Sequence, residues 1–166
     1  LRYFRSVRTT GRNESTVVAL FSAKLLNTGT SYMKMWMPAS SDVSYFTALA
    51  PSAKTASSPY QSKPSLVVTM RKEKPAVEEP FVVVYEPISD KLSTGLIESV
   101  DRIKLDSLGK KGCAIKVKTK EGDTFTLVNI LKDGPVILNN QKCCGDFAIF
   151  AKRKGKNSVY VGNGSF

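Results

Sequence analysis

Apolar and charged side chains alternate over residues 113–120, and this period of two constrains the fold more than any other feature. Cys113, Ile115 and Val117 fall on one side of the segment, whereas lysines occupy the intervening positions. The pattern predicts a β-strand with one buried and one solvent-exposed face, because successive strand side chains point in opposite directions. Glu121-Gly122-Asp123 has the composition of a tight turn, and residues 124–131 are again apolar and β-branched. We therefore predict a β-hairpin here.

The rest of the chain continues in the same manner, with short apolar or alternating runs separated by turn-forming residues. Further strands are expected at residues 16–26, 32–37, 43–49, 65–70, 81–85, 97–105, 136–138, 146–152 and 158–161. The run at 81–85 is apolar throughout and is bounded by Pro80 and Pro87, which predicts a central strand buried on both faces. No segment has a strong helical period. We expect an all-β fold, an antiparallel β-sandwich of about ten strands with little helix.

A chain of 166 residues is long enough for one domain with a substantial core. We expect residues 1–166 to form a single β-sandwich domain. A seam near residues 86–91 would separate a larger N-terminal sheet from a smaller C-terminal one.

The composition excludes several classes of site. The chain has no histidine, which excludes catalytic triads, Cys-His dyads and zinc sites that depend on imidazole. Its three cysteines, Cys113, Cys143 and Cys144, are too few for a disulfide framework; we expect them to be half-buried apolar residues, with a bridge from Cys113 to one of the pair as the alternative. No catalytic residue, metal or cofactor is predicted. No apolar run is long enough for a membrane-spanning helix.

The first twelve residues are rich in arginine and lack the apolar stretch of a secretory signal. We expect that a signal has been removed or that the sequence is an internal piece of a longer chain.

Positive charge is the clearest chemical feature, with 25 Lys and Arg against 14 Asp and Glu and a net charge of +11. Two local groups are candidates for binding acidic polysaccharide through sulfate or carboxylate groups. The first is the turn cluster Lys152, Arg153, Lys154 and Lys156, and the second is the strand row Lys116, Lys118 and Lys120. The alternatives are a solvated hairpin tip for the first group, and edge lysines that prevent aggregation for the second.

The positions of the aromatic residues help to distinguish a polysaccharide from a nucleic acid as the expected partner. Trp36, Tyr32 and Tyr45 are the candidates for exposed rings that stack on a sugar, with ordinary packing as the alternative. Five other aromatics lie in apolar runs and are expected in the core: Phe81, Tyr85, Phe125, Phe147 and Phe150. Single-stranded nucleic acid requires exposed aromatics interleaved with basic residues, so nucleic acid is not the expected partner. Glu86, at a strand end, is expected to be a structural hydrogen-bonding residue and not half of a glycosidase pair.

Four blocks carry a resemblance to a known family. They are Met35-Trp36-Met37-Pro38, Tyr45-Phe46-Thr47-Ala48-Leu49-Ala50-Pro51, Pro64-Ser65-Leu66-Val67-Val68 and Pro80-Phe81-Val82-Val83-Val84-Tyr85-Glu86-Pro87. With the tail at 145–150 and 159–164, this order resembles the C-terminal β-sandwich region of heparinase II/III-type polysaccharide lyases. The resemblance covers most of residues 30–166.

The resemblance implies a large secreted or periplasmic bacterial enzyme, in which an upstream helical toroid precedes the β-sandwich. Such enzymes cleave acidic polysaccharides by β-elimination with Tyr and His side chains. Those catalytic positions lie upstream of the matched blocks, and this chain has no histidine, so no catalytic residue is carried over. The resemblance predicts a non-catalytic accessory region that supports a catalytic domain and contacts acidic polysaccharide. The alternative is an independent carbohydrate-binding or structural module with no lyase domain.

Overall fold

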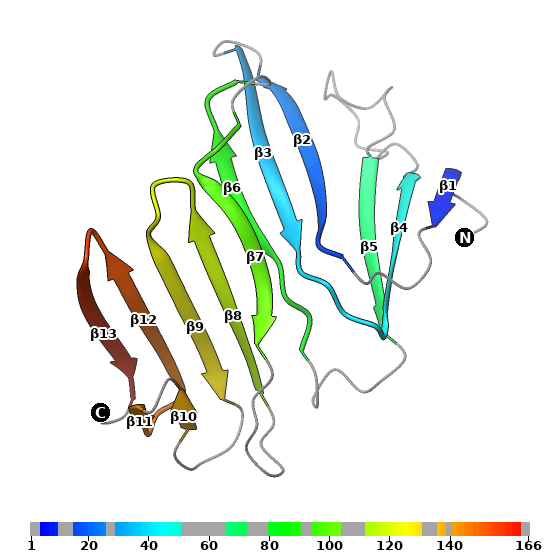
Figure 1. Ribbon diagram of the computed structural model, residues 1–166. Coiled ribbons are helices and arrows are strands. Elements are labelled where there is room, and N and C mark those ends of the chain that lie inside the picture. The colour runs from blue at the N-terminus through cyan, green and yellow to red at the C-terminus, as the bar shows by residue number, and fades with distance from the viewer. Residues whose placement is uncertain are drawn as a thin grey trace. The chain divides into compact units, whose positions relative to one another are not determined.

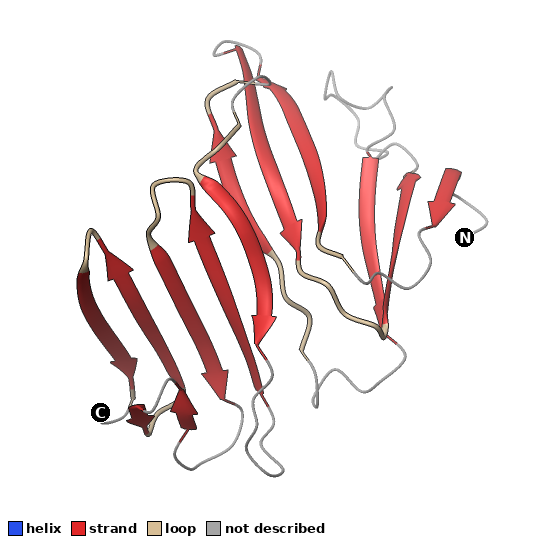
Figure 2. Cartoon of the chain, in the orientation of Figure 1, coloured by secondary structure: helices blue, strands red, loops and turns tan. Residues whose placement is uncertain are grey.

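Every described secondary-structure element is a β-strand (Figures 1 and 2). The computed structural model describes residues 4–9, 15–25, 29–50, 66–72, 80–90, 94–103, 112–130, 136–138 and 141–163. These residues contain thirteen strands and no helix, and all of their strand pairs are antiparallel. The all-β antiparallel fold predicted from the alternating pattern is confirmed. Sequence patterns did not predict β1 (Arg5–Thr9) or β11 (Gln141–Cys143).

The chain divides into two compact units, and the first comprises Leu1–Glu14 and Ser40–Lys74. Its sheet has the order β1-β4-β5, where β4 is Val43–Leu49 and β5 is Leu66–Lys72. Val43, Tyr45 and Ala48 of the central strand, β4, are buried. The β1 pairing contains a register shift between Arg5 and Arg8, and Ser6 has a positive φ of 52° there.

The second unit comprises Ser15–Ala39 and Pro75–Phe166 and contains the remaining sheets. A three-stranded sheet has the order β2-β3-β6, formed by β2 (Val17–Leu25), β3 (Gly29–Met37) and β6 (Val84–Ile88). A two-stranded pair is formed by β10 (Val136–Leu138) and β11. Between Ile88 and Ile97 the chain leaves the three-stranded sheet and enters the five-stranded one.

The five-stranded sheet has the order β13-β12-β9-β8-β7. Its strands are β7 (Ile97–Ile103), β8 (Gly112–Thr119), β9 (Thr124–Ile130), β12 (Phe147–Arg153) and β13 (Lys156–Gly162). The predicted hairpin is present as β8 and β9, and Gly122 in its turn has a φ of +85°. That left-handed conformation explains why glycine occupies the turn.

The two faces of the five-stranded sheet differ in character. The lysine face carries Lys116 and Lys118. On the same face, Ala114, Val128 and Phe150 belong to one buried apolar cluster. The cysteine face carries Cys113, Ile115 and Val117, which pack with Val82 and Val100 in a second cluster. Trp36 of β3 and Val84 of β6 pack against this second cluster. Within the second unit, side chains of the two sheets thus share one core, as in a β-sandwich.

The apolar run at 81–85 is not the central strand that we predicted. The strand β6 begins at Val84 and includes Pro87, and it lies at the edge of its sheet. Phe81 is 46% exposed and Tyr85 is 58% exposed, whereas a strand buried on both faces would cover them. The edge position explains how a proline is tolerated inside the strand, because one side of an edge strand makes no ladder hydrogen bonds.

Cys113 and Cys144 are both free thiols, so the alternative bridge from Cys113 is not formed. The part of the chain that the structure describes contains no helix capable of crossing a membrane.

Candidate functional site

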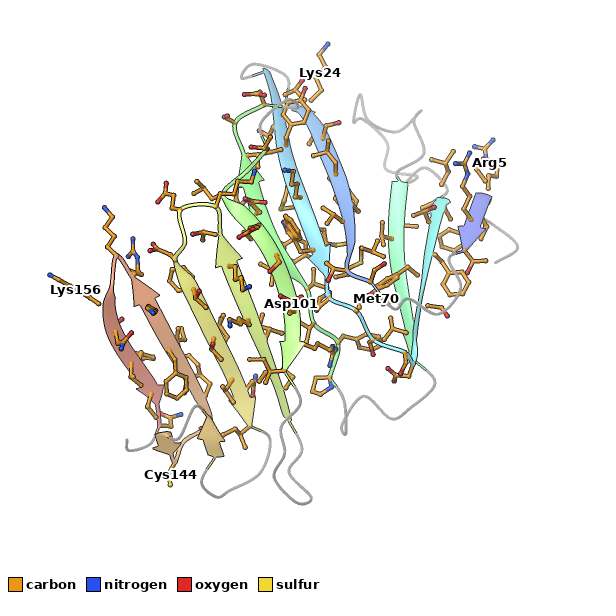
Figure 3. All side chains as sticks on the ribbon, in the orientation of Figure 1. Arg5, Lys24, Met70, Asp101, Cys144 and Lys156 are labelled. Carbon is orange, nitrogen blue, oxygen red and sulfur yellow. The ribbon has the colours of Figure 1, made fainter. Side chains whose placement is uncertain are left out.

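The basic cluster at the β12–β13 turn is contiguous in sequence but divided in space. Lys154 and Gly155 have φ values of 46° and 78°, which gives the two-residue turn typical of a tight β-hairpin. Lys152 lies in register with Thr124 of β9 and Asn157 of β13, so it belongs to the lysine face. Arg153 and its register partner Lys156 alternate to the opposite face. Lys156 projects from the end of the hairpin (Figure 3).

Two rungs of side chains cross the lysine face. The first aligns Lys118, Thr124, Lys152 and Asn157, and the second aligns Asp101, Lys116, Thr126, Phe150 and Val159. Lys118 and Lys152 are separated by one intervening strand, which corresponds to about 10 Å. Strand pairing therefore brings together cations that lie far apart in the sequence.

An open groove of about 430 Å³ lies over these rungs. We define the lysine groove by the side chains that line it on this face and by Lys118 beside them. They are Lys116, Lys118, Thr124, Thr126, Phe150, Lys152, Asn157 and Val159. Its floor is closed, since Phe150 is 9% exposed and Thr126 is 5% exposed. Charged ammonium groups, hydroxyls and an amide thus surround a buried floor.

A carboxylate lies next to one end of the groove. Asp101 of β7 is the register partner of Lys116 and is exposed, and Figure 3 labels it on its strand. Its Oδ2 accepts a hydrogen bond of 2.9 Å from the hydroxyl of Ser99. Opposite charges at directly opposed positions attract, so Asp101 lowers the positive potential at this end.

Two of the predicted binding cations make other contacts. The Nζ of Lys120 donates to the carbonyl oxygens of Thr94 and Gly95, each at 2.9 Å. Arg153 Nε donates to Asp123 Oδ2 at 3.3 Å, and the backbone N–H of Lys154 donates to Asp123 Oδ1 at 3.1 Å. Through these bonds, the buried Asp123 holds the β12–β13 turn against the β8–β9 turn. Lys120 and Arg153 therefore have structural roles that their sequence context did not indicate.

Trp36 and Tyr45 do not present the exposed rings that we expected. Trp36 packs against the core of the cysteine face, and its indole N–H donates to Glu86 Oε2 at 2.9 Å. Tyr45 lies in the other unit and is 2% exposed. Both residues occur in alternating strands whose faces the sequence did not distinguish, and each falls on a covered face.

Glu86 anchors the turn between β6 and β7. Besides Trp36, its carboxylate accepts hydrogen bonds from the backbone N–H groups of Leu96 and Ile97. Gly95 has a φ of +72°, and a Cβ there would overlap the Glu86 carboxylate. With 6% of its surface exposed, Glu86 is the structural hydrogen-bonding residue that we predicted.

Sequence reasoning missed two exposed aromatics on the cysteine face. Phe147, which we expected in the core, is 38% exposed, and Tyr160 is 60% exposed. Their ring centroids are 5.5 Å apart. No local sequence pattern could have revealed this pair, because it depends on β12 and β13 lying together at one end of the sheet.

The remaining titratable chemistry is limited. Burial raises the pKa of the Cys113 thiol, and the nearby Arg102 guanidinium opposes that effect by lowering it. Within the described ranges, no group of three or more Cys, Asp or Glu side chains is arranged to hold a metal ion.

One curated protein relates this chain to a class of enzyme. The chain is 35% identical over 86 residues to an endo-acting ulvan lyase of Formosa agariphila. The match covers 52% of this chain and 10% of the lyase, so the chain spans a small part of that protein's length. No family model and no solved structure matches. Over part of its length, the chain is thus related to a polysaccharide lyase.

Proposed function

We propose that this chain is a non-catalytic β-sandwich module of a heparinase II/III-like polysaccharide lyase. It supports an upstream helical catalytic domain of the same protein and contacts acidic polysaccharide through the lysine groove. The observation that carries the proposal is the convergence of Lys116, Lys118 and Lys152 on one face. The partial relationship to an ulvan lyase supports the choice of a polysaccharide as ligand.

The groove supplies both kinds of contact that an acidic sugar chain needs. Ammonium groups about 10 Å apart across the strands offer counterions to carboxylate or sulfate groups. Thr124 and Asn157 lie on the rung between and beside these cations, and they donate and accept hydrogen bonds with sugar hydroxyls. Each exposed ion pair contributes about 0–1 kcal/mol, so affinity depends on several pairs that form on one polyanion.

Nucleic acid is a poorer ligand for the same groove. Sequence-tolerant binding of single strands uses aromatic faces on which bases stack. The ring that lines this groove, Phe150, is 9% exposed and lies in the floor. A base has no open ring face to contact there.

We assign no catalytic role to this chain. Glu86, the carboxylate within the block at 80–87, already accepts hydrogen bonds from Trp36, Leu96 and Ile97. A buried carboxylate that accepts these bonds is not free to abstract a substrate proton. Catalysis is therefore the task of another part of the parent protein.

The parent protein, in this proposal, is secreted or periplasmic, as the resemblance to secreted lyases and the polysaccharide ligand support. An independent carbohydrate-binding module is the second candidate function, because the groove lies within one unit of the chain. The length of the encoded precursor separates these two: an upstream helical domain of several hundred residues supports the lyase module, and its absence supports the independent one.

The proposal is tested with purified residues 1–166 and three polysaccharides: ulvan, heparin and uncharged dextran. We expect retention by ulvan or heparin at low salt, loss of retention near 1 M NaCl where the Debye length falls to about 3 Å, and no retention by dextran. We also expect no sustained rise in ultraviolet absorbance from unsaturated products. Equal retention by dextran, or eliminative cleavage that survives repurification, would overturn the proposal.

A further inference from the structure

The cysteine face is covered near β8 and open at β12 and β13. Ile115 and Val117 of β8 are buried in the core that Trp36 and Val84 join. Farther along the same face, Tyr160 of β13 is 60% exposed and Phe147 of β12 is 38% exposed. The outer strands therefore carry large aromatic rings beyond the region that the other sheet covers.

The two rings form a defined pair. Their centroids lie 5.5 Å apart and their planes are tilted by 47°, which is within the geometry that aromatic pairs favour. Phe147 lies in register with Gly162 of β13, and a Cβ at Gly162 would overlap the Phe147 ring. Glycine thus makes room for the ring on the sheet surface, and the pair is held in place.

A polar side chain lies beside the pair, and a polar contact lies at the nearby strand ends. Asn129 of β9 is exposed and is the register partner of Phe147 on its other side. At the strand ends, Asn163 Nδ2 donates to Asp146 Oδ2 at 3.0 Å. Asp146 is fixed by its backbone, since its carbonyl accepts from Ile130 N–H at 2.8 Å and its N–H donates to the Gly162 carbonyl at 3.2 Å. An apolar platform with a few fixed polar groups is the usual composition of a small-ligand site.

We propose that Phe147 and Tyr160 form a second, uncharged subsite that stacks on a pyranose ring of the polysaccharide. One face of such a ring presents C–H groups, which match the negative face of an aromatic ring, while its hydroxyls reach the Asn129 amide and the Tyr160 hydroxyl. The subsite is distinct from the lysine groove, because the two lie on opposite faces of the same sheet. It rests on the proposed polysaccharide ligand but not on the groove.

The exposed amide beside the rings favours a sugar over a protein surface. A protein partner would favour a continuous apolar patch, whereas here the exposed Asn129 lies in register beside Phe147. The relationship to an ulvan lyase supports a polysaccharide as the occupant. Stacking contacts are not screened by salt, so this subsite differs from the groove in a measurable way.

The test is an NMR titration of the full chain with ulvan oligosaccharides and, separately, heparin oligosaccharides at about 0.5 M NaCl, where ion pairs are strongly screened. We expect amide shifts at Asn129, Phe147 and Tyr160, and a dissociation constant about fivefold or more weaker for Tyr160→Ala, in line with the loss of one aromatic contact. Tyr85→Ala is the matched control, because Tyr85 is 58% exposed on β6 and lies outside the pair. Phe147→Leu keeps apolar volume but removes the ring, and we expect it to weaken binding as well.

The inference is overturned if neither oligosaccharide shifts these amides, or if Tyr160→Ala and Tyr85→Ala bind equally. If the aromatic pair does not bind sugar but polysaccharide still retains the chain at low salt, the proposed function stands. Salt-resistant binding at the pair with no groove binding would support this inference and contradict the groove as the polyanion site.

Discussion

Different factors decide which side chains are exposed on the two faces of the five-stranded sheet. On the lysine face, charge is distributed by strand alternation and register, and three cations from β8 and β12 meet over a buried floor. On the cysteine face, exposure is decided by coverage. Ile115 is buried where side chains of the other sheet pack, whereas Tyr160 is open two strands beyond β9. The difference shows that local pattern determines which face a residue occupies, but not whether that face is covered.

The β12–β13 hairpin shows both factors within one short stretch of chain. Lys152 and Asn157 point to the lysine face, while Phe147 and Tyr160 belong to the cysteine face. The linear sequence of this hairpin suggests one basic cluster and scattered aromatics. Strand pairing converts that sequence into two separate surfaces.

The largest effect is expected at Gly95, which lies against the Glu86 carboxylate that binds Trp36 of the covered core. Alanine there must adopt a left-handed conformation, which costs about 1–2 kcal/mol, and its Cβ overlaps the buried Glu86 carboxylate. Displacing hydrogen bonds of a buried group costs about 1–3 kcal/mol more. We expect Gly95→Ala to lower the free energy of unfolding by about 3 kcal/mol in urea denaturation.

Gly122→Ala is the matched control for this change. Gly122 has a similar φ of +85°, but a Cβ added there meets no atom within 4 Å, so we expect a loss of only about 1 kcal/mol. Equal losses for both variants would show that the Glu86 anchor does not stabilise the β6–β7 turn.

A smaller effect is expected in thiol reactivity, which differs between covered and open parts of the surface. Cys113 is half-buried on the cysteine face, and burial raises the pKa of its thiol. The neutral thiol is therefore favoured in the folded state, and the associated stability is lost as pH rises through the raised pKa. We expect alkylation of Cys113 by iodoacetamide at pH 8 to be about tenfold slower in the native protein than in urea. Mass spectrometry of the modified peptide measures the alkylation rate. Equal rates in the native protein and in urea would contradict the burial of Cys113.

Much of the fold was predictable from alternation, and the site was predictable only in part. The alternation at residues 113–120 has a clear period of two, which reports local strand geometry directly, and it led to the β8–β9 hairpin. Lys116 and Lys152 were both identified as candidates, but their meeting depends on β9 lying between β8 and β12, a non-local pairing. Trp36 and Phe147 do not lie in the environments that we expected, because exposure depends on which part of a face other elements cover.

Removal of the Asp101 charge is expected to have a small effect in the opposite direction, because it should strengthen polyanion binding by the groove. Its carboxylate lies in register with Lys116 and offsets part of the charge that attracts a polyanion. We expect Asp101→Asn to strengthen binding of heparin about twofold at low salt, which is within the range of one exposed ion pair. Glu98→Gln, at the register shift of the same strand, is the control with the same change in charge. An equal gain in both would attribute the effect to net charge alone.

The central claim is that strand register, and not proximity in sequence, selects the cations that bind polysaccharide. Two variants lose the same formal charge: one replaces Lys116, Lys118 and Lys152 with serine, and the other replaces Arg153, Lys154 and Lys156. Both should first be shown to melt like the wild type, so that a folding defect is not mistaken for lost binding.

The measurement is the NaCl concentration at which each variant elutes from immobilised heparin and from immobilised ulvan. We predict that the first variant elutes at much lower salt than the wild type, because it empties the lysine groove of its cations. The second variant should elute close to the wild type, since Arg153 is paired with Asp123 and none of its three positions lines the groove. Elution of both variants at the same salt concentration, or earlier elution of the second, would contradict the account.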